Sequence, residues 1–231
     1  AVMAFLYASV GHGGASGYLA LMALWGVSPA LMKPTALLLN ILVSGIAFWN
    51  YYRSKHFQWD LFWPFALASI PMAFVGGMIT IDTLWYKKLL GVLLLVPVAR
   101  FLFVPENPAH TRPLHTGLAL AIGSIIGLLS GLTGIGGGIL LSPVILLLHL
   151  ANQKQAAAAS ALFILVNSIA GLAGLFTKGL QFSPDMYYYV LFALVGGFAG
   201  AYMGARKFNH QILRYVLAVV LLIAAWKLLL T

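Results

Sequence analysis

The feature that most constrains this chain is a cluster of glycines inside a long apolar stretch. Between Pro113 and Gln153 there is no Asp, Glu, Lys or Arg. This stretch is roughly twice the about 20 residues that one membrane crossing needs, so it must break. The segment Leu129–Gly138, which contains Gly134, Gly136, Gly137 and Gly138, marks the predicted break.

Glycine suits such a break for physical reasons. In hydrocarbon every backbone N–H and C=O needs a protein partner, so a helix that breaks at membrane depth must line a cavity or be buried in protein. Glycine adopts positive φ and lets another group approach the backbone closely. The half-helix after the break presents free N–H groups and a positive dipole end, which favour an anion. The alternative is close helix packing, which glycine also permits.

The composition identifies the class of protein. The chain is 62% hydrophobic and 7% charged, with a mean hydropathy of +0.98, whereas soluble domains carry about 25% charged residues. We therefore predict an all-α polytopic membrane protein. The net charge of +9 fits loop charges that set topology rather than a nucleic-acid surface. There is no cysteine, and we predict no metal site, no cofactor and no catalytic residue. Because the chain opens on Ala1 and not on Met, the sequence leaves open whether residues precede it.

The chain contains an internal repeat. A weaker copy of the glycine cluster lies near the start, at Val10–Gly17. Further segments match in order and at a nearly constant offset: Thr35–Leu37 with Ser160–Leu162, Lys55–Gln58 with Lys178–Gln181, and Val75–Gly77 with Val195–Gly197. We predict a first repeat over 1–104, a linker over 105–113 and a second repeat over 114–231, all within one integral membrane domain.

Each repeat is predicted to contain a glycine-broken helix, re-entrant in one interpretation, followed by three transmembrane helices. In the first repeat, Lys33 and Pro34 are expected to open a helix that runs to about Tyr52. If the broken element crosses once, the two repeats are parallel. If it forms a re-entrant hairpin or two crossings, the repeats are inverted. We favour inverted repeats, because 114–150 resembles two elements joined by a glycine turn.

Paired breaks in corresponding halves point to a transporter's binding site. The four acids, Asp60, Asp82, Glu106 and Asp185, all fall in loops or at helix ends, so none is placed for a cation site at the membrane midplane. We predict a substrate site made of these residues: Gly11, His12, Gly13, Gly14, Ser16, Asn40, Thr133, Gly134, Gly136, Gly137, Gly138 and Asn167.

Three of these side chains have an alternative role. As a cation, His12 could attract an anion or couple a proton, and as a neutral group it could cap the break. Asn40 and Asn167 lie in the middle of predicted helices that follow the two breaks. Their amides could donate to the substrate or form hydrogen bonds between helices.

The motif Gly134–Pro143, the helix with Ala159–Ala161 and the turn from Lys178 to Gln181 resemble the sulfite exporter TauE/SafE family of membrane permeases. The resemblance covers essentially the whole chain, although His12 departs from the family pattern. It implies a secondary transporter, most often an exporter, of sulfite, thiosulfate or small organosulfonates in the cell inner membrane, with multiple spans. The implied partners are the sulfur-containing anion and membrane lipid. Proton or ion coupling and a homo-oligomer stay open.

Two other functions compete with this one. A passive anion channel would use the same glycine site but needs a continuous pore. A rhomboid-like intramembrane serine protease would use Ser16, which lies in Gly14-Ala15-Ser16-Gly17, and would need a histidine base within hydrogen-bond reach. The repeat argues against the protease, because the second copy has Ile139 in place of Ser16.

Overall fold

The computed structural model describes residues 15–103, 112–179 and 210–230, together with 188, 191, 192 and 195. Within these residues the chain forms helices and no strand, which confirms the prediction of an all-α protein. The elements are α2 (Ala15–Leu24), α3 (Pro29–Arg53), α4 (Trp59–Met78), α5 (Thr83–Phe103), α6 (Thr116–Thr133), α7 (Gly138–Leu147), α8 (Gln153–Phe176) and α10 (His210–Leu230).

Four of these helices, α3, α4, α6 and α8, are long and apolar enough to cross a membrane. Helix α7 is a shorter apolar helix. Helix α3 begins earlier than the sequence predicted, at Pro29, and contains Pro34 as an internal residue. Proline suits the first position of a helix, as at Pro29, because the first N–H groups of a helix have no acceptor within it.

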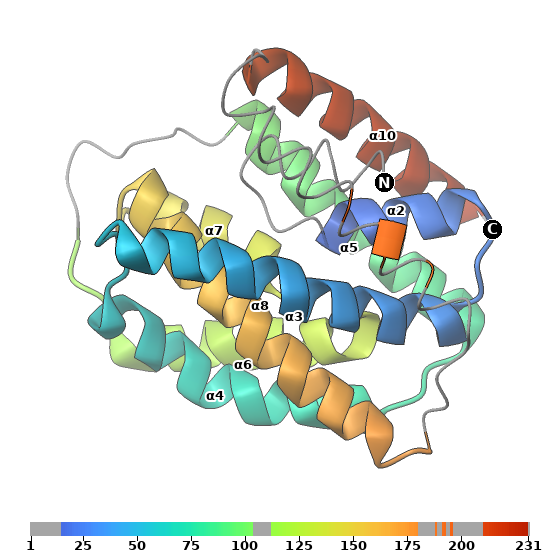
Figure 1. Cartoon of the computed structure of the whole chain (residues 1–231), viewed down its shortest axis with the longest axis horizontal. Helices are drawn as coiled ribbons and strands as arrows, with labels where there is room; N and C mark the ends of the chain where they lie inside the picture. Colours follow the sequence, from blue (N-terminus) through green and yellow to red (C-terminus); the bar gives the residue numbers. More distant parts are fainter. Residues whose placement is uncertain are drawn as a thin grey trace.

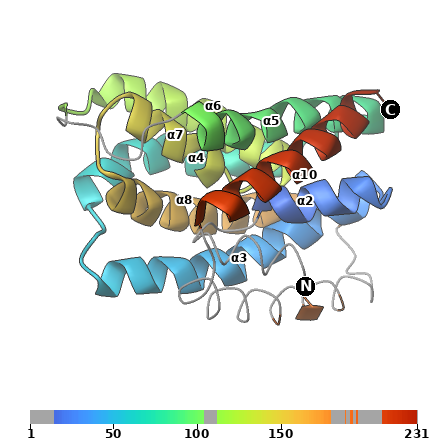
Figure 2. The same ribbon diagram turned by 90° about the horizontal axis from the view of Figure 1, so that it is seen from above.

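The helices form two groups (Figures 1 and 2). Helices α3, α4, α6 and α8 pack against one another, and α7 lies against α8. Helix α10 packs on α5 and on α2, which also contacts α3. Helices α3 and α8 run in opposite directions, since Leu37 lies beside Gly171 while Gly45 lies beside Leu165.

A glycine stripe joins α6 to α4. Gly123, Gly127 and Gly131 lie four residues apart, on one face of α6. A Cβ on each would overlap a carbonyl oxygen of α4, from Phe65, Ser69 and Ala73 in that order. The two helices are therefore parallel, and their backbones touch directly. Small residues permit this approach in membrane helices, where dispersion contacts replace the hydrophobic effect.

The pair Gly76-Gly77 extends the same contact. A Cβ on Gly76 would overlap the carbonyl oxygen of Leu128 in α6, and one on Gly77 would overlap that of Gly171 in α8. Helix α4 is thus held between α6 and α8 by glycine contacts.

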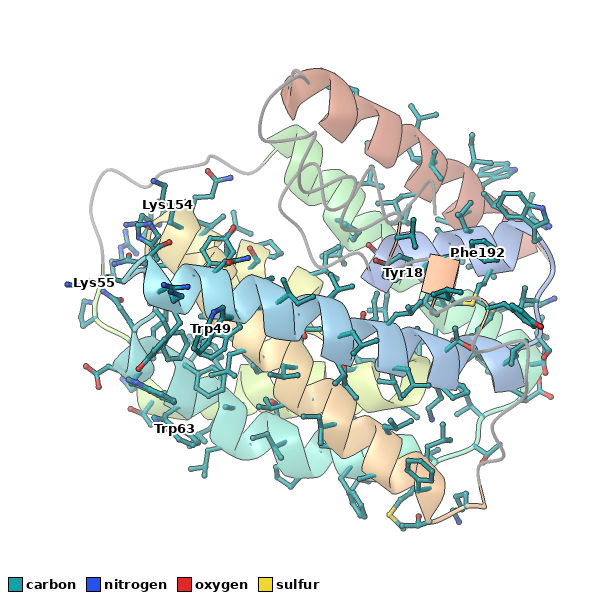
Figure 3. The ribbon with its side chains drawn as sticks, in the orientation of Figure 1. Tyr18, Trp49, Lys55, Trp63, Lys154 and Phe192 are labelled. Carbon is teal, nitrogen blue, oxygen red and sulfur yellow. The ribbon has the colours of Figure 1, made fainter. Side chains whose placement is uncertain are left out.

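Aromatic side chains gather where α3 ends and α4 begins. The rings of Trp59 and Trp63 stack at 5.8 Å between centroids, and Trp59 meets Phe57 edge-on at 4.8 Å. Trp49 and Lys55 lie at the same end of the molecule (Figure 3). Trp49 is 59% exposed and Trp63 52%. Such a girdle of exposed tryptophans beside basic residues is typical of the interface between hydrocarbon and lipid headgroups.

The glycine stripe predicts opposite outcomes for two alanine substitutions in α6. Gly127→Ala should lower the free energy of unfolding by at least about 1–3 kcal/mol, because the new Cβ meets the backbone of Ser69. Gly117→Ala should be neutral or slightly stabilising, because nothing lies within 4 Å of a Cβ there. Thermal unfolding in detergent measures both, and equal effects of the two variants would contradict the stripe.

Candidate functional site

The predicted break lies between α6 and α7. Helix α6 ends at Thr133, and Gly134 follows in the left-handed conformation with φ of 82°. Gly136 and Gly137 also have positive φ, at 81° and 75°, before α7 starts at Gly138. Three residues in this region of φ explain why the chain carries glycine here, since other residues adopt it only at a cost of about 1–2 kcal/mol each.

The chain folds back at this break. The backbone N–H of Arg112, which precedes α6, donates to the carbonyl oxygen of His149, which follows α7, at 2.7 Å. The end of α7 therefore lies beside the start of α6 (Figure 1). We call α6, the glycine turn and α7 the α6–α7 hairpin. The glycine turn is its tip, and residues 133–143 are buried.

The start of α7 leaves backbone donors free. The carbonyl oxygen of Gly137 accepts from the N–H groups of Leu140 and Leu141 at 3.0 Å. Within the described part of the chain, the N–H groups of residues 136–139 have no hydrogen-bond acceptor. They lie at the positive end of the helix dipole. This combination of free amides and a positive dipole end is the arrangement that binds anions at helix N-termini.

Two buried side chains from different helices meet this turn. Asn40 of α3 donates from Nδ2 to the carbonyl oxygen of Gly134 at 3.1 Å. A Cβ on Gly136 would lie 2.8 Å from that Nδ2 and 3.3 Å from Oγ of Ser168 in α8. Asn40 and Ser168 are both 0% exposed, and in the part of the chain that the structure describes Asn40 Oδ1 and Ser168 Oγ have no hydrogen-bond partner. The structure thus brings two polar groups with unused hydrogen-bonding capacity to Gly136.

Three other buried hydroxyl groups lack partners. Ser130 lies in the last turn of α6, and Ser142 lies in α7. Ser160 belongs to α8, and its carbonyl oxygen lies 2.6 Å from a Cβ built on Gly138. Buried hydroxyls normally find an acceptor, so this density of unpartnered ones marks the surroundings of α7 as unusual.

The predicted site residues of the first repeat are only partly described by the structure. Gly11, His12, Gly13 and Gly14 lie outside the described residues, so their place at the site stays a prediction. Ser16 is fully buried in the first turn of α2.

Thr133 and Asn167 have other partners. The hydroxyl of Thr133 donates to the carbonyl oxygen of Leu129 at 2.7 Å. Asn167 donates to the carbonyl oxygen of Phe163 and accepts from the Ser69 hydroxyl, both at 2.9 Å. Asn167 therefore joins α8 to α4 in the described structure.

Sequence analysis missed Lys33 as a member of this region. It is only 7% exposed, and its Nζ donates to the carbonyl oxygens of Gly76 and Gly77 at 3.2 Å and of Ile79 at 3.4 Å. Its Cα lies 3.2 Å from a Cβ built on Gly134. Lys33 therefore caps the C-terminal end of α4, where a cation suits the helix dipole. The available signal was an ionisable residue within an apolar helix.

Tyr86 of α5 was also missed. Its hydroxyl donates to the carbonyl oxygen of Thr133 at 2.8 Å, and its side chain is 2% exposed. Together with Asn40, it satisfies two carbonyl groups at the end of α6. At the tip of the α6–α7 hairpin, the carbonyl groups of Thr133 and Gly134 are thus paired, whereas the N–H groups of residues 136–139 have no acceptor in the described structure.

Comparison with known proteins gives a consistent result. A family model described as "Sulfite exporter TauE/SafE" matches residues 1–228. The probable membrane transporter protein y4hK of Sinorhizobium fredii is 36% identical over 99% of this chain and 94% of its own length. Two probable membrane transporter proteins of Bacillus subtilis are similar: YunE is 24% identical over 87% of this chain and 81% of its own length, and YjnA is 26% identical over 94% and 92%. No solved structure gave a significant match.

The cap made by Lys33 predicts a stability effect. Lys33→Met should lower the free energy of unfolding by about 1–3 kcal/mol, because buried carbonyl groups at the end of α4 lose their donor. Thermal unfolding in detergent measures this loss. Lys154→Met is the matched control, since Lys154 is exposed. A Lys33→Met protein as stable as the control would show that the cap contributes nothing net.

Proposed function

Because the chain belongs to the sulfite exporter TauE/SafE family, we propose that it is a secondary transporter that exports small sulfur-containing anions, such as sulfite, thiosulfate or organosulfonates. Membership makes it a membrane transporter of the TauE/SafE type. The substrate, the outward direction and the location in the cell inner membrane are our proposals. So is the position of the binding site at the glycine turn.

The observation that carries this proposal is the start of α7. The free N–H groups of residues 136–139 supply donors, and the helix dipole supplies positive potential. The unpartnered hydroxyl of Ser168, in α8, lies against the same turn. A sulfur oxyanion has oxygen acceptors that fit these donors. The site residues on this side are therefore Asn40, Ser168 and the glycines of the turn.

The acidic residues support an anion as the substrate. Asp60 and Asp82 lie at exposed helix ends, and Asp82 accepts from the N–H of Leu84 at 2.8 Å. The other two acids lie outside the described residues. No carboxylate among the described residues contacts the glycine turn, so no acidic side chain in its described surroundings opposes the binding of an anion.

We further propose that the halves 1–104 and 114–231 are inverted repeats joined by the linker 105–113. Helices α3 and α8 occupy corresponding places in the two halves, and their antiparallel packing supports inversion. The short helices α2 and α7 lead toward opposite ends of the molecule (Figure 1). In this arrangement the α6–α7 hairpin is a re-entrant element, and residues 11–14, with His12, complete the site from the first half.

The competing functions have less support. A channel needs an open path, whereas a Cβ on Gly137 would already lie 3.0 Å from Phe163 and from Ile126. Tight packing around the turn favours a transporter that opens alternately. For a protease using Ser16, His149 is a poor base, because it follows the end of α7, and α7 leads away from α2, the helix that carries Ser16 (Figure 1). Relatives named as transporters also support a permease.

The proposal predicts that Gly136→Ala abolishes anion binding. The new Cβ would lie 2.8 Å from both Asn40 Nδ2 and Ile164, so it displaces the turn and fills the space before the free amides. Calorimetric titration of sulfite into the purified protein should show loss of at least about tenfold in affinity.

Gly179→Ala is the matched control. Gly179 has a similar φ of 78° but nothing within 4 Å of a Cβ, so it imposes the same backbone strain away from the turn. This variant should bind as the unmodified protein does. If Gly136→Ala folds and binds sulfite normally, the glycines serve packing and the proposed site is wrong.

A further inference from the structure

One oxygen atom at the glycine turn restricts the ligand further. Asn40 Nδ2 faces the carbonyl oxygen of Gly134 at 3.1 Å. A carbonyl oxygen can only accept, so the nitrogen must face it and Oδ1 must face elsewhere. This Oδ1 is buried and has no hydrogen-bond partner among the described residues. The orientation of the amide is thus fixed by its neighbour, and its oxygen is an unused acceptor.

The other unused N–H groups and the nearby unpartnered side chain at the turn can donate. The N–H groups of residues 136–139 are donors only. The hydroxyl of Ser168 can donate as well as accept. Among the described polar side chains at the turn, Asn40 Oδ1 is therefore the one acceptor that cannot donate. An anion without hydrogen would satisfy the donors and leave Oδ1 of Asn40 unpaired.

Deepening the function proposed above and resting on it, we propose that the site selects anions that carry their own hydrogen-bond donor. The preferred ligand is a sulfur oxyanion with an O–H or N–H group, such as hydrogensulfite or an amino- or hydroxy-bearing sulfonate. Its oxygens accept from the amides of residues 136–139 and from Ser168, and its hydrogen is donated to Asn40 Oδ1. Fully deprotonated oxyanions such as sulfate are discriminated against.

A purely internal pairing is the competing explanation. Rotation of the Ser168 side chain could direct its hydroxyl toward Asn40, since both side chains lie beside Gly136. In that case Oδ1 would be satisfied within the protein, and a donor on the ligand would bring no advantage. The two explanations differ in what they predict for ligands of equal shape and charge.

Sulfamate and methanesulfonate provide that comparison. Both are monoanions with a tetrahedral SO₃ group, and they differ in an NH₂ group, which donates, against a CH₃ group, which does not. Calorimetric titration of each into the purified protein should show sulfamate binding at least about tenfold more tightly, because a buried polar group left unpaired weakens binding. This comparison uses the unmodified protein, so it does not depend on any variant that folds poorly.

Two variants assign the preference to the amide. Asn40→Leu should bring the ratio of the two affinities to about one, because the acceptor is gone. Ser44→Ala is the control: Ser44 lies one turn along α3, and its hydroxyl donates to the carbonyl oxygen of Asn40, not to its side chain. This variant should retain the preference.

The outcomes separate this inference from the proposed function. If methanesulfonate binds as tightly as sulfamate, the donor requirement is wrong while the anion site stands. The same conclusion follows if Asn40→Leu keeps the preference. If neither these anions nor sulfite bind, the anion site is wrong, and the donor requirement falls with it.

Discussion

The structure depends on one constraint: buried backbone groups must be paired, because hydrocarbon offers them no water. This constraint is strongest at helix ends, since each end leaves several backbone N–H or C=O groups without a partner in its own helix. Lys33 supplies donors to the end of α4, and Tyr86 and Asn40 supply them to the end of α6. The start of α7 is the described exception. This contrast is the reason that we propose the ligand site there.

Glycine serves two purposes in this chain that are easily confused. Gly123, Gly127 and Gly131 are ordinary helical residues, and because they have no Cβ, the backbones of α6 and α4 can touch. Gly134 and Gly136 supply the positive φ that breaks the helix. The helical glycines allow close packing around α4. The glycines of the turn leave the backbone N–H groups at the start of α7 without acceptors in the described structure. The proposed binding turn requires both, since its backbone donors cannot adjust as side chains do.

The sequence predicted the parts of the fold that depend on local patterns. The uncharged stretch and the glycines between Thr133 and Gly138 were sufficient to place the break, because φ preference is a property of single residues. Long-range partners were not predictable. Lys33 caps a helix end more than forty residues away, and Asn167 bonds Ser69 across two helices. The residues that flank Lys33 and Asn167 in the sequence give no indication of these partners. The spacing of Gly123, Gly127 and Gly131 did offer a signal for the α4–α6 contact.

Lys227, near the end of α10, donates from Nζ to the carbonyl oxygen of Leu24 at 2.7 Å, a contact that spans 203 positions of the chain. During synthesis α2 leaves the ribosome before any other described helix, and the residue that caps it leaves almost last. The carbonyl oxygens of Met22 and Ala23 are paired locally, by the N–H groups of Val27 and Gly26. The carbonyl oxygen of Leu24 receives the Lys227 donor only once α10 is inserted. Completion of the contacts of α2 is thus tied to the arrival of the last helix, so the N-terminal and C-terminal ends of the described structure are finished together.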